Sequence, residues 1–321
     1  MVARWKLRGA KMNEVVAAVD CGTNSIRLLV AEVLPDGSLN ELHRQMEIVR
    51  LGEGVDQTGE FSIDAIERTV RAAASYSDIA GKFGAMKLRF AATSATRDAK
   101  NRHLFTIPIE EIFGIKPEVI TGSEEAALSF IGATKSLVQL GKISKSPYLV
   151  IDIGGGSTEF VLGVTEPTQS ISVDIGCVRM SERHSLQEVV TDQQLAAAQL
   201  DIQAAIAKAA AVVDLKKAKS IIGVAGTVTT VAAIALGHTE YRSDLLHGAI
   251  ISAKQVSEVA AQLRSMSREQ KAAIPAMHPG RVDVIAAGAL VLDLIMQEVK
   301  LPELVVSEHD ILDGLALSLV S

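Results

Sequence analysis

Aromatic residues and cysteines are both scarce in this sequence of 321 residues. Phe, Trp and Tyr make up 3% of the chain, too few for a platform on which single-stranded nucleic acid or sugars stack. The two cysteines, Cys21 and Cys177, lie far apart, and neither they nor the seven histidines have the spacing of a metal site. We interpret the cysteines as thiols in a reducing cytosol and predict a cytoplasmic protein.

An excess of positive charge is also missing. The formal net charge is −6, and acidic residues outnumber basic ones both before and after residue 128. This balance excludes a basic nucleic-acid-binding domain, so an anionic ligand would be held by a local patch, a metal ion or backbone N–H groups. Hydrophobic residues account for 48% of the chain, which indicates a globular protein, and its length suits about two domains.

The sequence shows no pattern typical of a signal peptide or a membrane span. Met1 to Lys11 is basic but precedes no apolar core, so Met12 is an alternative to Met1 as the physiological start. The least polar stretch, Ile221 to Gly237, is interrupted by glycine and threonine. It favours a strand, a turn and a helix, and we expect no membrane partner.

Two similar strand–turn–strand patterns predict β-hairpins. The first runs from a strand ending at Asp20 through a Gly-Thr-Asn turn into 26–33, and the second from a strand ending at Asp152 through three glycines into 158–163. Helices are predicted over 62–83, from 121, over 192–213 and 253–266, from 281, and over 310–320, with Ser62 and Ser123 as N-caps. Further strands are predicted over 88–92, 119–120, 220–227 and 304–307, and this alternation predicts an α/β fold.

The two glycine turns have the composition of a phosphate site. Glycine permits positive φ and close backbone approach, and successive N–H groups of a turn form a nest for an anion. An aspartate at the end of the preceding strand supplies a hard oxygen ligand for Mg²⁺. One such turn is usually only a hairpin, but two of them, preceded by Asp20 and Asp152, favour phosphate binding.

The chain has two units in which a strand ends in aspartate and continues through a glycine turn into a second strand, and it has a later Gly-Val-Ala-Gly-Thr turn. With these features it resembles the actin, hexokinase and sugar-kinase superfamily. More narrowly, it resembles the short two-domain form of the exopolyphosphatase and guanosine pentaphosphatase (Ppx/GppA) family. The segments that carry the resemblance follow the family's order across residues 14–316 and are Ala18–Arg27, Ala92–Ala99, Ile120–Ala126, Val150–Glu159 and Arg281–Gly288. Longer members carry a C-terminal metal-dependent domain, whereas this sequence ends at Ser321.

The resemblance implies two actin-like (ribonuclease H-like) domains with a cleft between them. Domain I would comprise residues 14–128, with the C-terminal helix near 306–321 packed back on it, and domain II residues 129–305. The implied activity is Mg²⁺-dependent release of terminal orthophosphate from inorganic polyphosphate by direct attack of water. A second copy of the chain, in a homodimer, is a candidate partner.

Matching the chain to the family's motifs assigns roles to single residues. Glu125 matches the general base, and Asp152 and Glu159 match the carboxylates that hold the metal. Arg97 matches an arginine that contacts phosphate. The implied phosphate-binding residues of the two turns are Thr23, Asn24, Ser25, Gly154, Gly155, Gly156 and Ser157.

Each assignment has a purely structural counterpart. Glu125 and the adjacent Glu124 would offset the macrodipole in the first turn of a helix. The other counterparts are a turn cap for Asp152, a solvent-facing strand residue for Glu159, a surface charge at a helix start for Arg97, and helix-start residues for His309 and Asp310.

Three other functions share this fold and stay open. Hydrolysis of guanosine pentaphosphate (pppGpp) uses the same chemistry with a different leaving group. A sugar or acetate kinase would need an aspartate base in place of Glu125, and it would consume ATP only with an acceptor. A non-catalytic actin-like scaffold or nucleotide sensor would not need the carboxylates Glu125, Asp152 and Glu159 that are present here.

Overall fold

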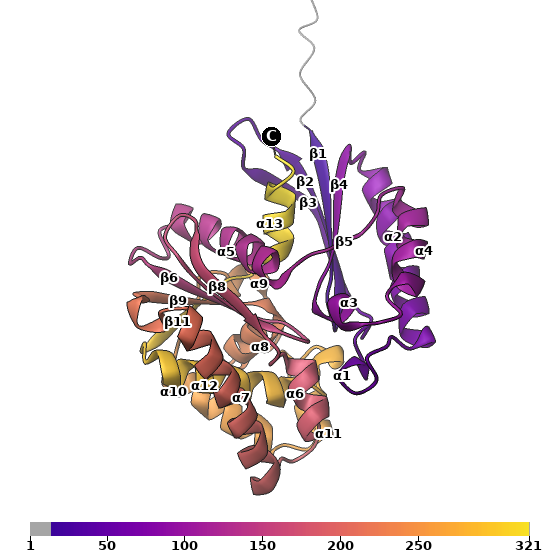
Figure 1. Ribbon diagram of the computed structural model, residues 1–321. Coiled ribbons are helices and arrows are strands. Elements are labelled where there is room, and N and C mark those ends of the chain that lie inside the picture. Colours follow the sequence, from indigo (N-terminus) through magenta and orange to yellow (C-terminus); the bar gives the residue numbers. More distant parts are fainter. Residues whose placement is uncertain (1–13, 321) are drawn as a thin grey trace, which may run out of the picture.

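The computed structural model describes residues 14–320, which fold around two β-sheets that lie at the upper right and the lower left of Figure 1. The choice between Met1 and Met12 as the start concerns residues outside this range. Helices cover both faces of each sheet, and the chain passes from the first sheet to the second through a single helix, α5 (Gly122–Gln139).

The first sheet has five strands in the order β3-β2-β1-β4-β5. The strands β1, β2 and β3 are antiparallel, and β4 and β5 run parallel to β1. Their bounds are β1 (Val15–Cys21), β2 (Ser25–Val33), β3 (Leu39–Ile48), β4 (Lys87–Ala92) and β5 (Glu118–Val119). The short helices α1 (Val55–Thr58) and α3 (Ser94–Asp98) follow β3 and β4.

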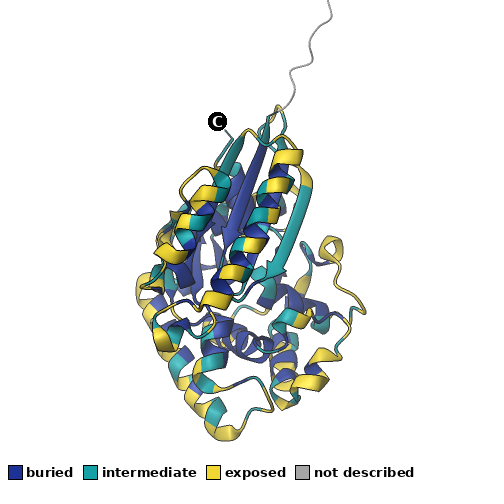
Figure 2. Cartoon of the chain, turned by 90° about the vertical axis from the view of Figure 1, so that its right-hand side faces the viewer, coloured by how far each residue is buried: buried dark blue, intermediate teal, exposed yellow. Residues whose placement is uncertain are grey.

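Both faces of β1 are buried, so its residues alternate between two cores. Ala17 and Val19 pack toward helices α2 (Ile63–Lys82) and α4 (His103–Phe113). Val16 and Ala18 pack on the opposite face against the C-terminal helix α13 (Ile311–Leu317). Figure 2 shows the exposed outer surfaces of α2 and α4 and the buried strands behind them.

The second sheet repeats the first. Its order is β8-β7-β6-β9-β11-β10, with an antiparallel unit β6-β7-β8, parallel strands β9 and β11, and the extra antiparallel strand β10. Their bounds are β6 (Tyr148–Ile153), β7 (Thr158–Gly163), β8 (Pro167–Val173), β9 (Ser220–Val224), β10 (Ile250–Ser252) and β11 (Glu303–Val306). The repeated topology confirms the prediction of an α/β fold with two actin-like domains.

Helix α5 covers one face of the second sheet, and a larger group of helices covers the other. The elements that complete this domain are α6 (Cys177–His184), α7 (Asp192–Val212), α8 (Ala225–Ala235), α9 (Ser243–Leu246), α10 (Ala253–Ser265), α11 (Arg268–Ala272), α12 (Ile285–Val299) and the 3₁₀ turns Leu215–Lys217 and Pro279–Arg281. Judged by length and composition alone, helix α7 could cross a membrane. Its residues Ala198, Ile202 and Ile206 pack instead into the core beside the second sheet.

Several local expectations were wrong for identifiable reasons. The N-cap of α5 is Thr121, whose hydroxyl accepts the Glu124 N–H at 3.2 Å, because Ser123 already lies inside the helix. Helix α12 begins at Ile285, since a 3₁₀ turn occupies Pro279–Arg281. The polar and half-buried strand β3 was not predicted, because it lacks a continuous apolar pattern.

Helices α5 and α13 cross at two glycines. A Cβ at Gly132 would lie 1.9 Å from the Asp310 carbonyl oxygen, and a Cβ at Gly314 would lie 2.1 Å from that of Leu128. Leu128 packs with α13, whereas Phe130 packs on the second sheet, so α5 contributes to both cores. The predicted boundary after residue 128 falls inside this helix.

We expect Gly314→Ala to destabilise the fold by about 1–3 kcal/mol, because the added methyl group would overlap the α5 backbone. Gly81→Ala is the matched control, since it lies in α2 with nothing within 4 Å of the added Cβ. That change should leave stability equal or raise it by up to about 1 kcal/mol. Urea unfolding would measure both, and equal unfolding free energies for the two variants would contradict the close crossing.

Candidate active site

The two glycine turns meet at the boundary between the sheets. A Cβ at Gly155 would lie 2.8 Å from the Thr23 Cβ, and one at Gly156 would lie 2.6 Å from the Ser94 Oγ. Together with the start of α8, the turns line a cavity of about 80 Å³. The turn residues predicted to bind phosphate line it without exception, namely Thr23, Asn24, Ser25, Gly154, Gly155, Gly156 and Ser157.

The second turn is oriented by helix α6. The carbonyl oxygens of Gly154, Gly155 and Gly156 accept hydrogen bonds at 2.9–3.1 Å from the first backbone amides of this helix. Within residues 14–320, the N–H groups of Gly155, Gly156 and Ser157 donate to no acceptor. Because its carbonyls are occupied and its N–H groups are free, the turn is a nest for an anion.

The two predicted metal-holding carboxylates are cross-strand partners on β6 and β7. The Ser129 hydroxyl donates to Asp152 at 2.6 Å, while Glu159 Oε1 accepts from Ser157 at 2.8 Å and Ser172 at 2.7 Å. Asp152 lines the cavity, whereas Glu159 is buried behind Ser157. Burial raises the pKa of Asp152 to about 7, and the charges of Asp310 and Glu125 add to this effect.

The donor set fits a hard cation such as Mg²⁺. Buried Asp20 Oδ1 and Glu159 Oε2 have no hydrogen-bond partner, and burial followed by the charges of Glu125 and Asp152 raises the pKa of Glu159. In the described part of the chain, no three His, Cys, Asp or Glu side chains converge as a metal cluster. Mg²⁺ does not require one, because it is usually bound by one or two carboxylates together with water and substrate phosphates.

The two neighbouring glutamates at the start of α5 point to different places. Glu125 is buried and lines the cavity, whereas Glu124 is half-buried, lies outside the cavity lining and pairs with Arg89. Burial raises the pKa of Glu125, while Arg97, which donates to Glu125 Oε2 at 2.6 Å, opposes the rise. Arg97 lies in the last turn of α3 and not at a helix start. Its guanidinium bonds Glu125 and is not among the groups that line the cavity, so its predicted contact with phosphate stays a prediction.

Two arginines that the sequence-based assignment left out also line the cavity. Arg27 donates to Asp20 at 2.6 Å and also pairs with Asp310, the N-cap of α13. The Arg281 guanidinium makes no hydrogen bond or ion pair among residues 14–320, and a Cβ at Gly226 would lie 1.2 Å from its Nη1. The sequence carries no signal for Arg281, because the need for glycine at Gly226 beside it is visible only in the folded structure.

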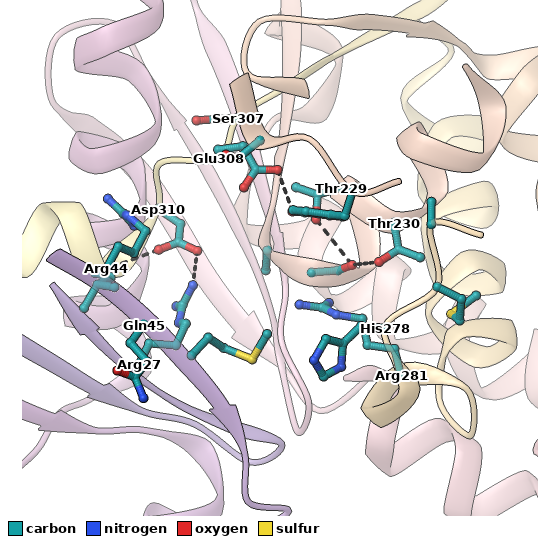
Figure 3. A pocket seen from close by; sticks show the side chains of 18 of the residues that line it. Arg27, Arg44, Gln45, Thr229, Thr230, His278, Arg281, Ser307, Glu308 and Asp310 are labelled. Atoms are coloured by element: carbon teal, nitrogen blue, oxygen red, sulfur yellow. Dashed lines mark hydrogen bonds and ion pairs between the residues drawn. The ribbon is translucent and has the colours of Figure 1, made fainter. Parts of the chain in front are cut away.

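A larger cavity of about 510 Å³ adjoins the phosphate cavity and shares Arg27 and Arg281 with it (Figure 3). Figure 3 shows these two arginines approaching it from opposite domains, with His278 beside Arg281. Its wall combines an apolar part with a charged part. The apolar part includes Met46, Pro275, Ala276, Met277 and Pro279 beside Tyr241, and the charged part includes Arg27, Arg44, Arg281, Glu308 and Asp310.

Comparison with known proteins adds an independent line of observation. The family model described as the Ppx/GppA phosphatase family matches residues 29–321. Exopolyphosphatase 2 of Mycobacterium tuberculosis is 44% identical over 316 residues, which cover 95% of this chain and 98% of that protein.

Two further relatives differ in how much of them this chain spans. Guanosine-5′-triphosphate,3′-diphosphate pyrophosphatase of Pseudoalteromonas atlantica is 33% identical over 67% of this chain and 41% of that protein. The crystal structure of an exopolyphosphatase-like protein superposes with a TM-score of 0.91 at 39% identity, covering 96% of this chain and 98% of that one.

The raised pKa of Asp152 predicts how stability depends on pH when metal is removed. Between its ordinary value of 3.8 and about 7, the folded state binds more protons at Asp152 than the unfolded state does. The free energy of unfolding should therefore fall as pH rises through this window. In the presence of a chelator, we expect the melting temperature to fall from acidic to neutral pH.

Asp152→Asn should make the melting temperature fall less steeply with pH, because asparagine does not titrate. Asp78→Asn, on the exposed face of α2, controls for the loss of an acidic residue. The measurement is a series of thermal melts across pH for the three proteins. A slope in Asp152→Asn as steep as in the wild type would show that Asp152 does not carry the effect.

Proposed function

The chain belongs to the Ppx/GppA phosphatase family and is a phosphoanhydride hydrolase, and we propose that it acts as an exopolyphosphatase. In this reaction a Mg²⁺-dependent attack of water releases the terminal orthophosphate of inorganic polyphosphate. The observation that carries the proposal is the buried carboxylate of Glu125 on the wall of a cavity whose other wall offers unpaired N–H groups.

The chemistry follows from the charges of the substrate. The terminal phosphate of polyphosphate carries negative oxygens that repel a nucleophile, and the free N–H groups of Gly155, Gly156 and Ser157 would bind and neutralise them. Mg²⁺, when bound by Asp152 and Glu159, would supply further neutralisation of these oxygens. The loose transition state of phosphoryl transfer then depends mainly on positioning and electrostatics.

Glu125 would act as the general base. Arg97 fixes one oxygen of its carboxylate, and burial keeps its affinity for a proton above that of an exposed glutamate. A water beside Glu125 would give up a proton to the carboxylate as its oxygen bonds to the terminal phosphorus. The bridging P–O bond breaks at the same step, which leaves orthophosphate and a chain shorter by one unit, with no phosphoenzyme.

We expect Glu125→Gln to lower kcat by roughly 10²-fold or more with little change in KM, because glutamine keeps the shape of the side chain but accepts no proton. Glu124→Gln is the matched control, since it changes the adjacent residue and breaks only the ion pair with Arg89. Steady-state phosphate release measures both, with a thermal melt to check folding. An inactive Glu124→Gln beside an active Glu125→Gln would reverse the assignment.

A second candidate substrate is pppGpp, and the 510 Å³ cavity is the observation that favours it. A nucleoside placed against the apolar part of its wall, beside Tyr241, would leave the phosphates directed past Arg27 and Arg281 toward the glycine turns. The relative from Pseudoalteromonas atlantica, whose name specifies this nucleotide, supports the same candidate. Both substrates would use Glu125 in the same way.

Purified protein should release orthophosphate from polyphosphate with Mg²⁺, lose this activity in excess chelator, and regain it when Mg²⁺ is restored, because the predicted ligands are hard oxygens. Assays with pppGpp in parallel should give a lower kcat/KM. A higher value for pppGpp would make it the main substrate. No phosphate release from either compound would contradict the proposed function and favour a kinase or a scaffold.

A further inference from the structure

Arg179 on helix α6 connects the phosphate turn to the other domain. Its Nε donates to the Gly156 carbonyl at 2.8 Å, and its terminal nitrogens donate to Asp56 of α1 at 2.5 Å and to Asp98 of α3. Its side chain is 12% exposed. One guanidinium thus bonds three separate segments, two of which follow strands of the first sheet, and Figure 1 shows α6 beside α1 and α3.

The other hydrogen bonds to the carbonyls of this turn come from its own domain. The amides of Cys177 and Val178 donate to Gly154 and Gly155, and the amide of Arg179 itself donates to Gly155 at 3.1 Å. The Gly156 carbonyl, which accepts from Gly176 as well as from Arg179, lies where the turn touches Ser94 of the first domain. Arg179 therefore bonds the turn at the residue where segments of both domains contact it.

We propose that Arg179 is a positioning residue that locks the phosphate turn in place when Asp56 and Asp98 of the first domain hold its guanidinium. It contacts no substrate in this role. It acts through the Gly156 carbonyl, which shares a planar peptide unit with the free N–H group of Ser157, so the placement of this carbonyl sets the direction of that N–H group. The consequence for catalysis rests on the proposed release of phosphate at this turn.

The neighbouring Arg183 offers a matched comparison. It lies one turn further along α6 and shares the acceptor Asp56 at 2.9 Å, but its other acceptor is Asp201 at 2.9 Å in its own domain. It makes no bond to the phosphate turn among the residues described. A variant at Arg183 therefore removes an arginine and a contact to Asp56 without changing the support of the turn.

Hydrogen exchange at the amides of residues 176–179 tests the proposal without any substrate, since these amides donate to the carbonyls of the turn. We expect faster exchange in Arg179→Gln and in Asp98→Asn, and wild-type exchange in Arg183→Gln. The amides of the double variant Arg179→Gln/Asp98→Asn should exchange no faster than those of Arg179→Gln, because both changes break the same connection between the turn and the first domain. Equal exchange in Arg179→Gln and Arg183→Gln, or unchanged exchange in Asp98→Asn, would overturn the proposal.

Kinetics supply the second readout. Displacement of the turn should lower kcat for polyphosphate roughly 10- to 100-fold in Arg179→Gln, and inorganic phosphate should inhibit this variant more weakly. Arg179→Lys should not restore kcat, because an ammonium cannot form the three directed bonds of a guanidinium. Restoration by lysine would instead indicate a role of charge alone and overturn the proposal. A wild-type protein that releases no phosphate would contradict the proposed function, while the exchange experiment would still decide the role of Arg179.

Discussion

The contact between two glycine turns from different domains is the constraint on which the site depends. At Gly155 and Gly156 a side chain would overlap Thr23 and Ser94, and a Cβ at Gly176 would lie 2.3 Å from the Gly155 backbone. Because these positions are glycine, the side chains of Thr23 and Ser94 and the backbone of Gly176 can lie directly against the turn. Because α6 occupies the carbonyls on one side, the N–H groups of the turn remain for a ligand on the other.

The charges around this contact are unfavourable in the absence of ligands. The carboxylates of Asp20, Glu125, Asp152 and Glu159 are buried together, and burial raises the pKa of each one. Arg27 and Arg97 offset part of this charge, and Arg281 lines the same cavity and forms no ion pair within residues 14–320. Buried carboxylates with strongly shifted pKa values cluster at functional sites, and the proposed binding of a cation and an anionic substrate would relieve this charge.

Helix α5 links the chemistry to the packing of the whole molecule. Its first turn carries Glu125, its middle crosses α13 at Gly132, and its remainder covers the second sheet. The N-cap of α13, Asp310, pairs with Arg27 on β2 at the edge of the cavity. The position of the proposed base relative to the phosphate turn therefore depends on the same helix crossing that joins the two cores.

The sequence alone determined the repeated part of this protein. Apolar strands that end in Asp20 and Asp152, followed by glycine turns, identified both hairpins, the α/β class and the turn residues, because strand periodicity and glycine are local signals. The neighbouring Glu124 and Glu125 could be distinguished only by resemblance, and the fold then placed Glu125 in the cavity and Glu124 at the surface.

Tertiary structure decided the interactions that join distant segments. Arg97 reaches Glu125 across 28 positions, Arg27 reaches Asp310 across 283, and Arg179 reaches Asp56 across 123. Arg281 and Gly226 likewise meet only when α8 and the 3₁₀ turn before α12 pack together. No local pattern specifies such pairs, because the partner of a charged side chain is set by which surfaces the two sheets and their helices bury against each other.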